Sequence, residues 1–119
     1  MITFQEILYA QQRIRSHVFR TPLRYSFLLS ERVGSSVFLK LENWQITGSF
    51  KLRGALNRMA LLTDEERAHG IVTASAGNHA NGVGYAARTM HILPATIFTG
   101  GVEAHRFTRI TRFLKILAM

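Results

Sequence analysis

Two short stretches of the sequence combine glycine, small polar residues and charged groups that are suited to chemistry. The first stretch, residues 43–55, contains Lys51, and the second stretch, residues 75–82, contains Gly77. Each stretch follows a predicted strand and leads into a predicted helix. The start of a helix presents unpaired backbone amides and partial positive charge, so both stretches are candidate anion sites. Gly77 also lets the backbone approach a ligand closely.

Lys51 is a candidate nucleophile because it falls in the first turn of its predicted helix. There the helix dipole disfavours a cation and so favours the neutral amine, which is the form that attacks a carbonyl or an aldehyde cofactor. The alternative is that Lys51 extends into solvent from the helix end, as a surface lysine does. The residues alone leave both interpretations open.

The elements that must position these stretches alternate between helices and strands. Capping boxes at residues 3–6 and 63–66 predict two helix starts, and Gly34 and Gly70 predict two helix ends. The expected helices cover residues 3–16, 26–33, 50–62, 63–69 and 79–90, and the expected strands cover residues 37–41, 71–74 and 95–98. This alternation predicts an α/β fold with a parallel sheet, in which ligands bind beyond the carboxyl ends of the strands.

Length and composition exclude several classes of protein. The 119 residues, 13.5 kDa in mass, allow one compact domain over residues 1–119. Hydrophobic residues make up 47% and charged residues 18%, which excludes wholesale disorder. Cysteine is absent, which excludes disulfides, thiolate metal sites and a cysteine nucleophile. Because the chain has neither a signal-peptide pattern nor an apolar run of about 18 residues, we expect a soluble, cytoplasmic protein.

The chain is strongly basic, with a net charge of +8 and a pI near 11.1. The positive residues are scattered except near the end, where Arg106, Arg109, Arg112 and Lys115 recur every three residues among apolar side chains. On a helix this spacing forms a basic ridge beside an apolar face. Such a helix could bind nucleic acid or a membrane surface, but the same pattern is typical of a helix packed on a core. We therefore expect neither a nucleic acid nor a membrane as partner.

Taken together, residues 47–55 and 75–79 resemble the signature of the fold type II pyridoxal-phosphate enzymes, specifically the threonine/serine dehydratase (ammonia-lyase) and serine racemase group. The segments at residues 21–23 and 38–43 fit the same family in order and approximate spacing. The resemblance runs from about residue 3 to residue 98. It implies a partial three-layer sandwich with a parallel sheet, the N-terminal part of the tryptophan synthase β-like fold.

The resemblance also implies roles for named residues. Lys51 would hold pyridoxal 5′-phosphate as a Schiff base, Phe50 would pack on a face of the pyridine ring, and Asn78 would hydrogen-bond the 3′-oxygen. The substrate carboxylate would lie on the amides of the loop formed by Ser75, Ala76, Gly77, Asn78 and His79. Ser49 and His79 themselves are expected to be an N-cap and a helix-start residue, and no metal is expected.

By the same resemblance, the reaction is an ammonia-lyase reaction on L-threonine or L-serine. The substrate amine would displace Lys51, whose free amine would then remove the Cα proton. The β-hydroxyl would leave, and hydrolysis of the released aminoacrylate would give a 2-keto acid and ammonia. Serine racemases resemble this chain but carry a serine at the position of Ala76, and that hydroxyl delivers a proton to the opposite face of Cα. Ala76 therefore favours dehydration over racemisation.

Members of this family are several-fold longer than 119 residues. We therefore expect the chain to be the N-terminal portion of a dehydratase, with the cofactor-phosphate region absent and the activity impaired by truncation. Full-length relatives are expected to be homo-oligomers. An inactive fragment, or a binding module that uses the basic segment at residues 106–115, are the alternatives.

Overall fold

The computed structural model describes residues 1–93 and 95–98. Side-chain caps begin the helices at residues 4–14, 27–33 and 64–69. At the start of α1 (Phe4–Ile14), the Thr3 amide donates to Glu6 Oε2 at 2.7 Å, and the Glu6 amide donates to Thr3 Oγ1 at 3.2 Å. The same reciprocal pair, Thr63 with Glu66, begins α4 (Asp64–His69). Both predicted capping boxes are therefore confirmed, and each satisfies helix-start amides that would otherwise lack partners.

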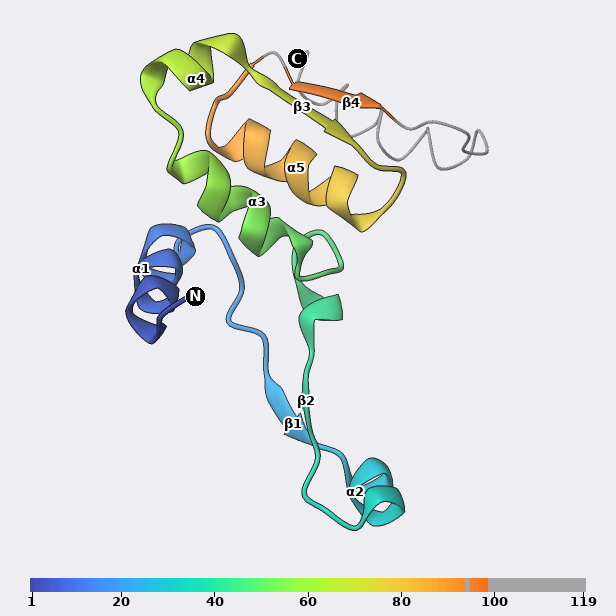
Figure 1. The fold of residues 1–119 in the computed structure, drawn as a ribbon. Coiled ribbons are helices and arrows are strands. Elements are labelled where there is room, and N and C mark those ends of the chain that lie inside the picture. The colour runs from blue at the N-terminus through green and yellow to red at the C-terminus, as the bar shows by residue number, and fades with distance from the viewer. Residues whose placement is uncertain (94, 99–119) are drawn as a thin grey trace.

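The other elements follow the predicted order along the chain (Figure 1). They are β1 (Leu23–Tyr25), α2 (Phe27–Val33), β2 (Phe38–Lys40), a 3-10 turn (Glu42–Trp44), α3 (Lys51–Ala60), β3 (Ile71–Ala74), α5 (Asn78–Thr89) and β4 (Ala95–Phe98). Of these, β1 and the 3-10 turn are not predicted by the sequence pattern. Gly34 ends α2 in the left-handed conformation, at φ 65°, as predicted. The basic segment at residues 106–115 lies outside the described residues.

The parallel sheet is formed by β3 and β4, which pair from Ile71 beside Ala95 to Ala74 beside Phe98. Helix α5 connects the two strands and contacts both of them, which is the predicted strand–helix–strand crossover. The α/β class is therefore confirmed. Because the two strands are parallel, their carboxyl ends lie at the same edge, beside the start of α5 (Figure 1).

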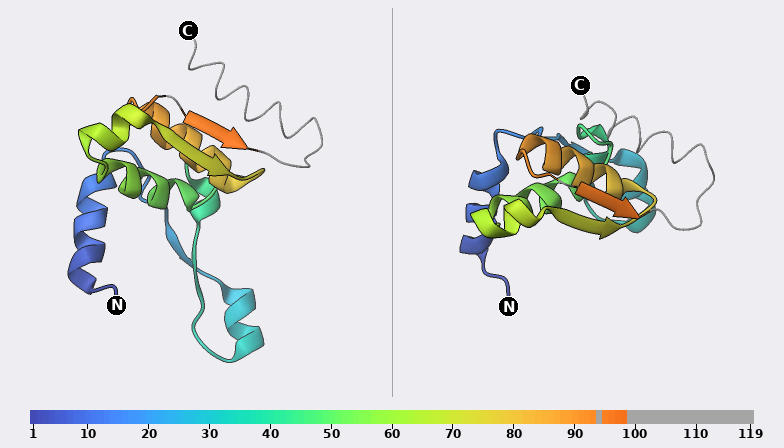
Figure 2. Two further views of the ribbon diagram at one scale, coloured as in Figure 1. Left: turned by 45° about the horizontal axis from the view of Figure 1, so that its top comes forward. Right: turned by 90° about the horizontal axis from the view of Figure 1, so that it is seen from above.

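The prediction that β2 belongs to this parallel sheet is wrong. The strand exists, but it pairs antiparallel with β1, from Leu23 beside Lys40 to Tyr25 beside Phe38. The seven-residue α2 turns the chain back, and a bond from the Ser26 amide to the Val37 carbonyl oxygen, at 2.9 Å, extends the pairing. We call residues 23–40 the arm, since β1, α2 and β2 project from the rest of the molecule (Figures 1 and 2).

The core lies between α3 and α5, which run side by side in Figures 1 and 2. Leu52, Leu56 and Ile92 are fully buried, and the small residues Ala86 and Ala87 of α5 let the two helices approach closely. Helix α1 joins the same cluster through Ile14. Within residues 1–93 and 95–98, no helix is both long enough and apolar enough to cross a membrane. The two helices that follow the chemically interesting loops are thus held by one shared core.

Candidate active site

Lys51 is the first residue of α3, and its side chain is exposed. Its Nζ lies 5.0 Å from the ring centroid of Phe50, within the range of a cation–π contact. Phe50 is itself 57% exposed, so its ring is also accessible to a ligand. The predicted position of the lysine in the first helical turn is therefore confirmed, and the amine is accessible to a reagent from solvent.

The N-cap of α3 is Phe50, one residue later than the sequence predicts. Ser49 was expected at this position because its hydroxyl can accept a bond from a helix-start amide. The Ser49 hydroxyl does accept a hydrogen bond from the Lys51 amide, at 3.4 Å, and Ser49 is buried. The expected cap is thus wrong in its position, although Ser49 still contacts the backbone of the lysine.

The second loop, residues 75–79, leads from β3 into α5 and is organised by Ser75. Ser75 Oγ accepts hydrogen bonds from the amides of Gly77 and Ala80, both at 3.3 Å. The amides of Asn78 and His79, the first two residues of α5, make no hydrogen bond to any of the described residues. These two amides, at the positive end of the helix dipole, can donate hydrogen bonds to an anionic ligand.

The surroundings of the second loop leave room for a ligand. A Cβ atom added to Gly77 would have no heavy atom within 4 Å, apart from its chain neighbours. The Asn78 side chain is exposed. The loop is therefore open on the side of Gly77, and the backbone there can contact a bound molecule without an intervening side chain.

The starts of α3 and α5 meet at Gly82. A Cβ atom added to Gly82 would lie 2.9 Å from the backbone nitrogen of Leu52 and 3.0 Å from the carbonyl carbon of Lys51. Gly82 is four residues after Asn78, hence about one helical turn, or roughly 6 Å, further along the same face of α5. The structure therefore brings the backbone of Lys51 close to the loop that carries the free amides.

An ion pair anchors α3 two residues after Lys51. Arg53 Nε donates to Glu42 Oε2 at 2.7 Å, and Arg53 Nη2 donates to Glu42 Oε1 at 2.9 Å, which makes the pair bidentate. Arg53 also donates to the Phe19 carbonyl oxygen at 2.9 Å, and the Thr21 hydroxyl donates to Glu42. The hydrogen bonds from Arg53 lower the pKa of the Glu42 carboxyl below its ordinary value. The charged carboxylate thus ties the first turn of α3 to the preceding chain.

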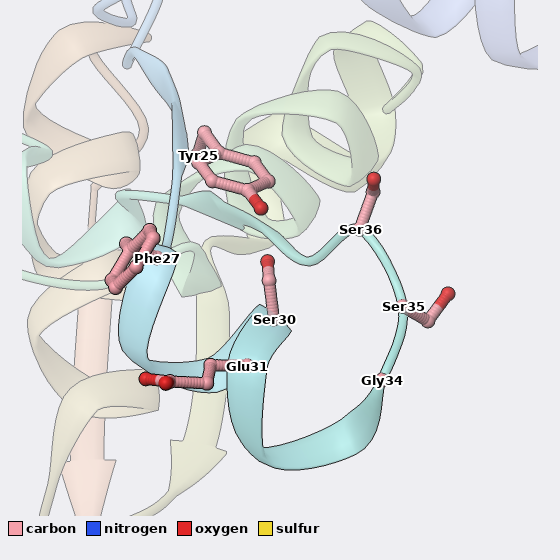
Figure 3. Close-up of a pocket in the computed structure, with 7 residues that line it drawn as sticks. All are labelled: Tyr25, Phe27, Ser30, Glu31, Gly34, Ser35 and Ser36. Carbon is pink, nitrogen blue, oxygen red and sulfur yellow. The ribbon is translucent and has the colours of Figure 1, made fainter.

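Among the residues that the structure describes, two cavities lie away from Lys51, which lines neither of them. One, of about 370 Å³, lies at the tip of the arm beside α2 and is lined by Tyr25, Phe27, Ser30, Glu31, Gly34, Ser35 and Ser36 (Figure 3). The other, of about 390 Å³, is lined by residues of α3, β3 and α5 that include Arg58 and His79. His79 therefore lines a cavity that Lys51 does not line.

Sequence patterns do not assign a role to Gly82, Glu42 or Arg53. Gly82 has a usable signal, because a glycine inside a helix costs stability and so indicates a close approach of another backbone. The pairing of Glu42 with Arg53 has no such signal, since eleven residues and a change of secondary structure separate them.

Removing the hydroxyl of Ser75 is expected to loosen the start of α5. In Ser75→Ala, the amides of Gly77 and Ala80 lose their partner, and we expect the free energy of unfolding to fall by about 1 kcal/mol. Urea denaturation measures this change. The matched control is Ser36→Ala, which removes an exposed hydroxyl and should change the stability by less than about 0.5 kcal/mol. Equal effects of the two substitutions would contradict the role given to Ser75.

Known proteins resemble this chain over most of its length. It is 55% identical over 97 residues to the L-threonine ammonia-lyase of Thermotoga maritima, covering 82% of this chain and 24% of that protein. It is 40% identical over 123 residues to the L-threo-3-hydroxyaspartate ammonia-lyase of Saccharomyces cerevisiae, covering 92% of this chain and 37% of that protein. The structure of maize serine racemase superposes with a TM-score of 0.80 at 39% identity, covering 90% of this chain and 32% of that one.

This chain therefore spans between about a quarter and just over a third of the length of these proteins. The family model described as pyridoxal-phosphate dependent enzyme matches residues 14–114. This range contains both loops and the whole of α3 and α5. The resemblance drawn from the two loop sequences is confirmed, and the chain belongs to the family of pyridoxal-phosphate-dependent enzymes.

Proposed function

We propose that this site serves a pyridoxal-phosphate-dependent ammonia-lyase that acts on a 2-amino-3-hydroxy acid, L-threonine or L-serine. One observation carries the proposal. Lys51, whose amine is accessible, is the first residue of α3, and the backbone of α3 contacts α5 at Gly82. Gly82 lies about one helical turn from the free amides of Asn78 and His79 at the start of α5. The backbone of the residue that carries the amine thus lies close to the helix start that we propose as the anion site for the substrate. The names of the two ammonia-lyase relatives, whose printed substrates are both 2-amino-3-hydroxy acids, support the substrate class.

The described residues fit the cofactor at three points. Lys51 offers an exposed amine to its aldehyde, Phe50 offers a largely exposed ring to one face of the pyridine, and Asn78 offers an exposed amide side chain to the 3′-oxygen. When bound, pyridoxal phosphate supplies an electron sink that stabilises negative charge developing at the substrate Cα.

The protein's own groups would bind the substrate and move its protons. The amides of Asn78 and His79 bind the carboxylate and so fix the orientation of Cα. Lys51 Nζ, as a free amine, takes the Cα proton as general base. Ala76 has no hydroxyl that could donate a proton to the opposite face of Cα. Loss of the β-hydroxyl is therefore favoured over racemisation. Water then hydrolyses the released enamine to a 2-keto acid and ammonia.

The test is a product assay on the purified chain with pyridoxal phosphate and L-threonine, in which 2-oxobutanoate is quantified by mass spectrometry. Free cofactor reacts slowly by itself, so Lys51→Arg is the matched control. We expect more keto acid from the wild-type chain than from this variant. The rate should be low, because we propose that the residues that bind the cofactor phosphate are not among these 119. Equal yields from the two chains would contradict the proposal.

Serine racemase is the second candidate, favoured by the similarity to the maize enzyme. The same assay with L-serine separates the two activities, since an ammonia-lyase forms pyruvate and a racemase forms D-serine. The absence of a hydroxyl at Ala76 leads us to expect pyruvate in excess. An excess of D-serine would favour the racemase.

A further inference from the structure

Helix α5 carries two buried glycines, and only one of them is in close contact with another backbone. A Cβ atom added to Gly84 would lie 3.8 Å from the Cδ1 atom of Ile97, which is an ordinary contact with a side chain. At Gly82 the three nearest atoms, at 2.9, 3.0 and 3.2 Å, all belong to the backbone of Lys51 and Leu52. Backbone atoms cannot move to another rotamer as a side chain can. A methyl group at position 82 must therefore push the two helices apart.

From this contact we infer that Gly82 is a positioning residue that sets the distance between Lys51 and the loop at residues 75–79. The inference rests on the function proposed for Lys51. Carbon atoms pack comfortably at about 3.5–4.0 Å, so the helices must separate by roughly 0.5–1 Å to admit a methyl group. Whether α3 or α5 moves, the separation between the Lys51 backbone and the Asn78 and His79 amides increases.

A shift of this size is large on the scale of a functional site. Reacting groups must be held within about 0.5 Å of their productive positions, and a misplacement of about 1 Å can cost a hundredfold. The displacement would fall on the first turn of α3, where the Lys51 amide bonds Ser49 and the Arg53 amide bonds the Phe50 carbonyl oxygen. Gly82 therefore acts on the site through the Lys51 backbone, with no contact to substrate required.

The test compares Gly82→Ala with Gly84→Ala, which adds the same methyl group to the same helix two residues away. Each chain is incubated with pyridoxal phosphate, reduced with borohydride and digested. The labelling of Lys51 is then measured by mass spectrometry relative to Lys40 in the arm. We expect this ratio to fall about 10- to 100-fold in Gly82→Ala and to stay within about twofold of the wild-type ratio in Gly84→Ala. An unchanged ratio in Gly82→Ala would overturn the inference.

A general loss of stability must be separated from a local displacement. Met59→Ala removes a buried side chain of α3 two turns away from Lys51, so it destabilises the chain without touching the contact at Gly82. We expect it to keep the wild-type labelling ratio; a ratio reduced as far as in Gly82→Ala would overturn the inference. If Gly82→Ala is unfolded in buffer, trimethylamine N-oxide, which favours the compact state, is added to all samples before labelling.

A second measurement needs no cofactor and keeps the two proposals distinguishable. Hydrogen exchange of the peptide that contains residues 50–54 should be faster in Gly82→Ala than in Gly84→Ala. If the wild-type chain is not labelled at Lys51, the proposed function fails, while the exchange rates still test the role of Gly82. Equal exchange rates in the two variants would contradict that role.

Discussion

Lys51→Arg is expected to lower the affinity for pyridoxal phosphate at least about 100-fold. The guanidinium keeps the positive charge beside the Phe50 ring, but it does not condense with an aldehyde. Only stacking on Phe50 and hydrogen bonds then hold the cofactor, and such contacts contribute about 1–3 kcal/mol in total. Titration of each chain with the cofactor, followed by absorbance of the bound form, measures the change.

Lys40→Arg is the matched control for this substitution. Lys40 ends β2 in the arm, and its Nζ donates to the Thr21 carbonyl oxygen, a bond that arginine can replace. The affinity of Lys40→Arg should stay within about twofold of the wild-type value. Comparable losses in the two variants would mean that the cofactor reacts with lysines of this chain without selection.

Glu42→Gln is expected to lower the free energy of unfolding by about 2 kcal/mol at neutral pH, because it removes the charge from a bidentate pair. The Glu42 side chain is only 17% exposed and that of Arg53 is 30% exposed. Water therefore has little access to the Arg53 guanidinium and solvates it poorly once the carboxylate is removed. The substitution also weakens the bond from the Thr21 hydroxyl. Urea denaturation at pH 7 gives the difference between the variant and the wild-type chain.

This difference should depend on pH with a defined sign. The pKa of Glu42 is lowered in the folded chain, so its stabilising effect is complete above the ordinary pKa of glutamate, about 4.3. The effect is lost as the pH falls through the lowered pKa, and the two chains should then become equally stable. Glu31→Gln, at an exposed glutamate of α2, should change stability by less than about 0.5 kcal/mol. A difference between Glu42→Gln and wild type that stays constant down to acid pH would contradict the ion pair.

Local signals in the sequence predict most of the fold correctly. The capping boxes at Thr3 and Thr63 and the glycine at Gly34 act within a few residues of themselves, so their effect does not depend on the rest of the molecule. The pairing of β2 depends on contacts that are remote in sequence. Alternation of helices and strands favours a parallel sheet, but it does not show that a short helix turns β2 back against β1.

The candidate site divides in the same way between local and remote contacts. Residues adjacent in sequence predict that Lys51 lies in the first turn of a helix. They also predict that the second loop leads into α5. The contact between Gly82 and the Lys51 backbone arises only when α3 and α5 share one core. The hydrogen bonds that Ser75 accepts from the Gly77 and Ala80 amides likewise form only in the folded loop. The sequence alone therefore does not show that the amides of Asn78 and His79 stay free.

The most direct test of the role of Lys51 is to identify the lysine that the cofactor labels in the wild-type chain. The chain contains three lysines, Lys40, Lys51 and Lys115. After incubation with pyridoxal phosphate at low molar excess, borohydride reduction and peptide mass mapping, we expect the adduct to be found predominantly on Lys51. A distribution in which Lys40 or Lys115 carries as much adduct as Lys51 would contradict the assignment.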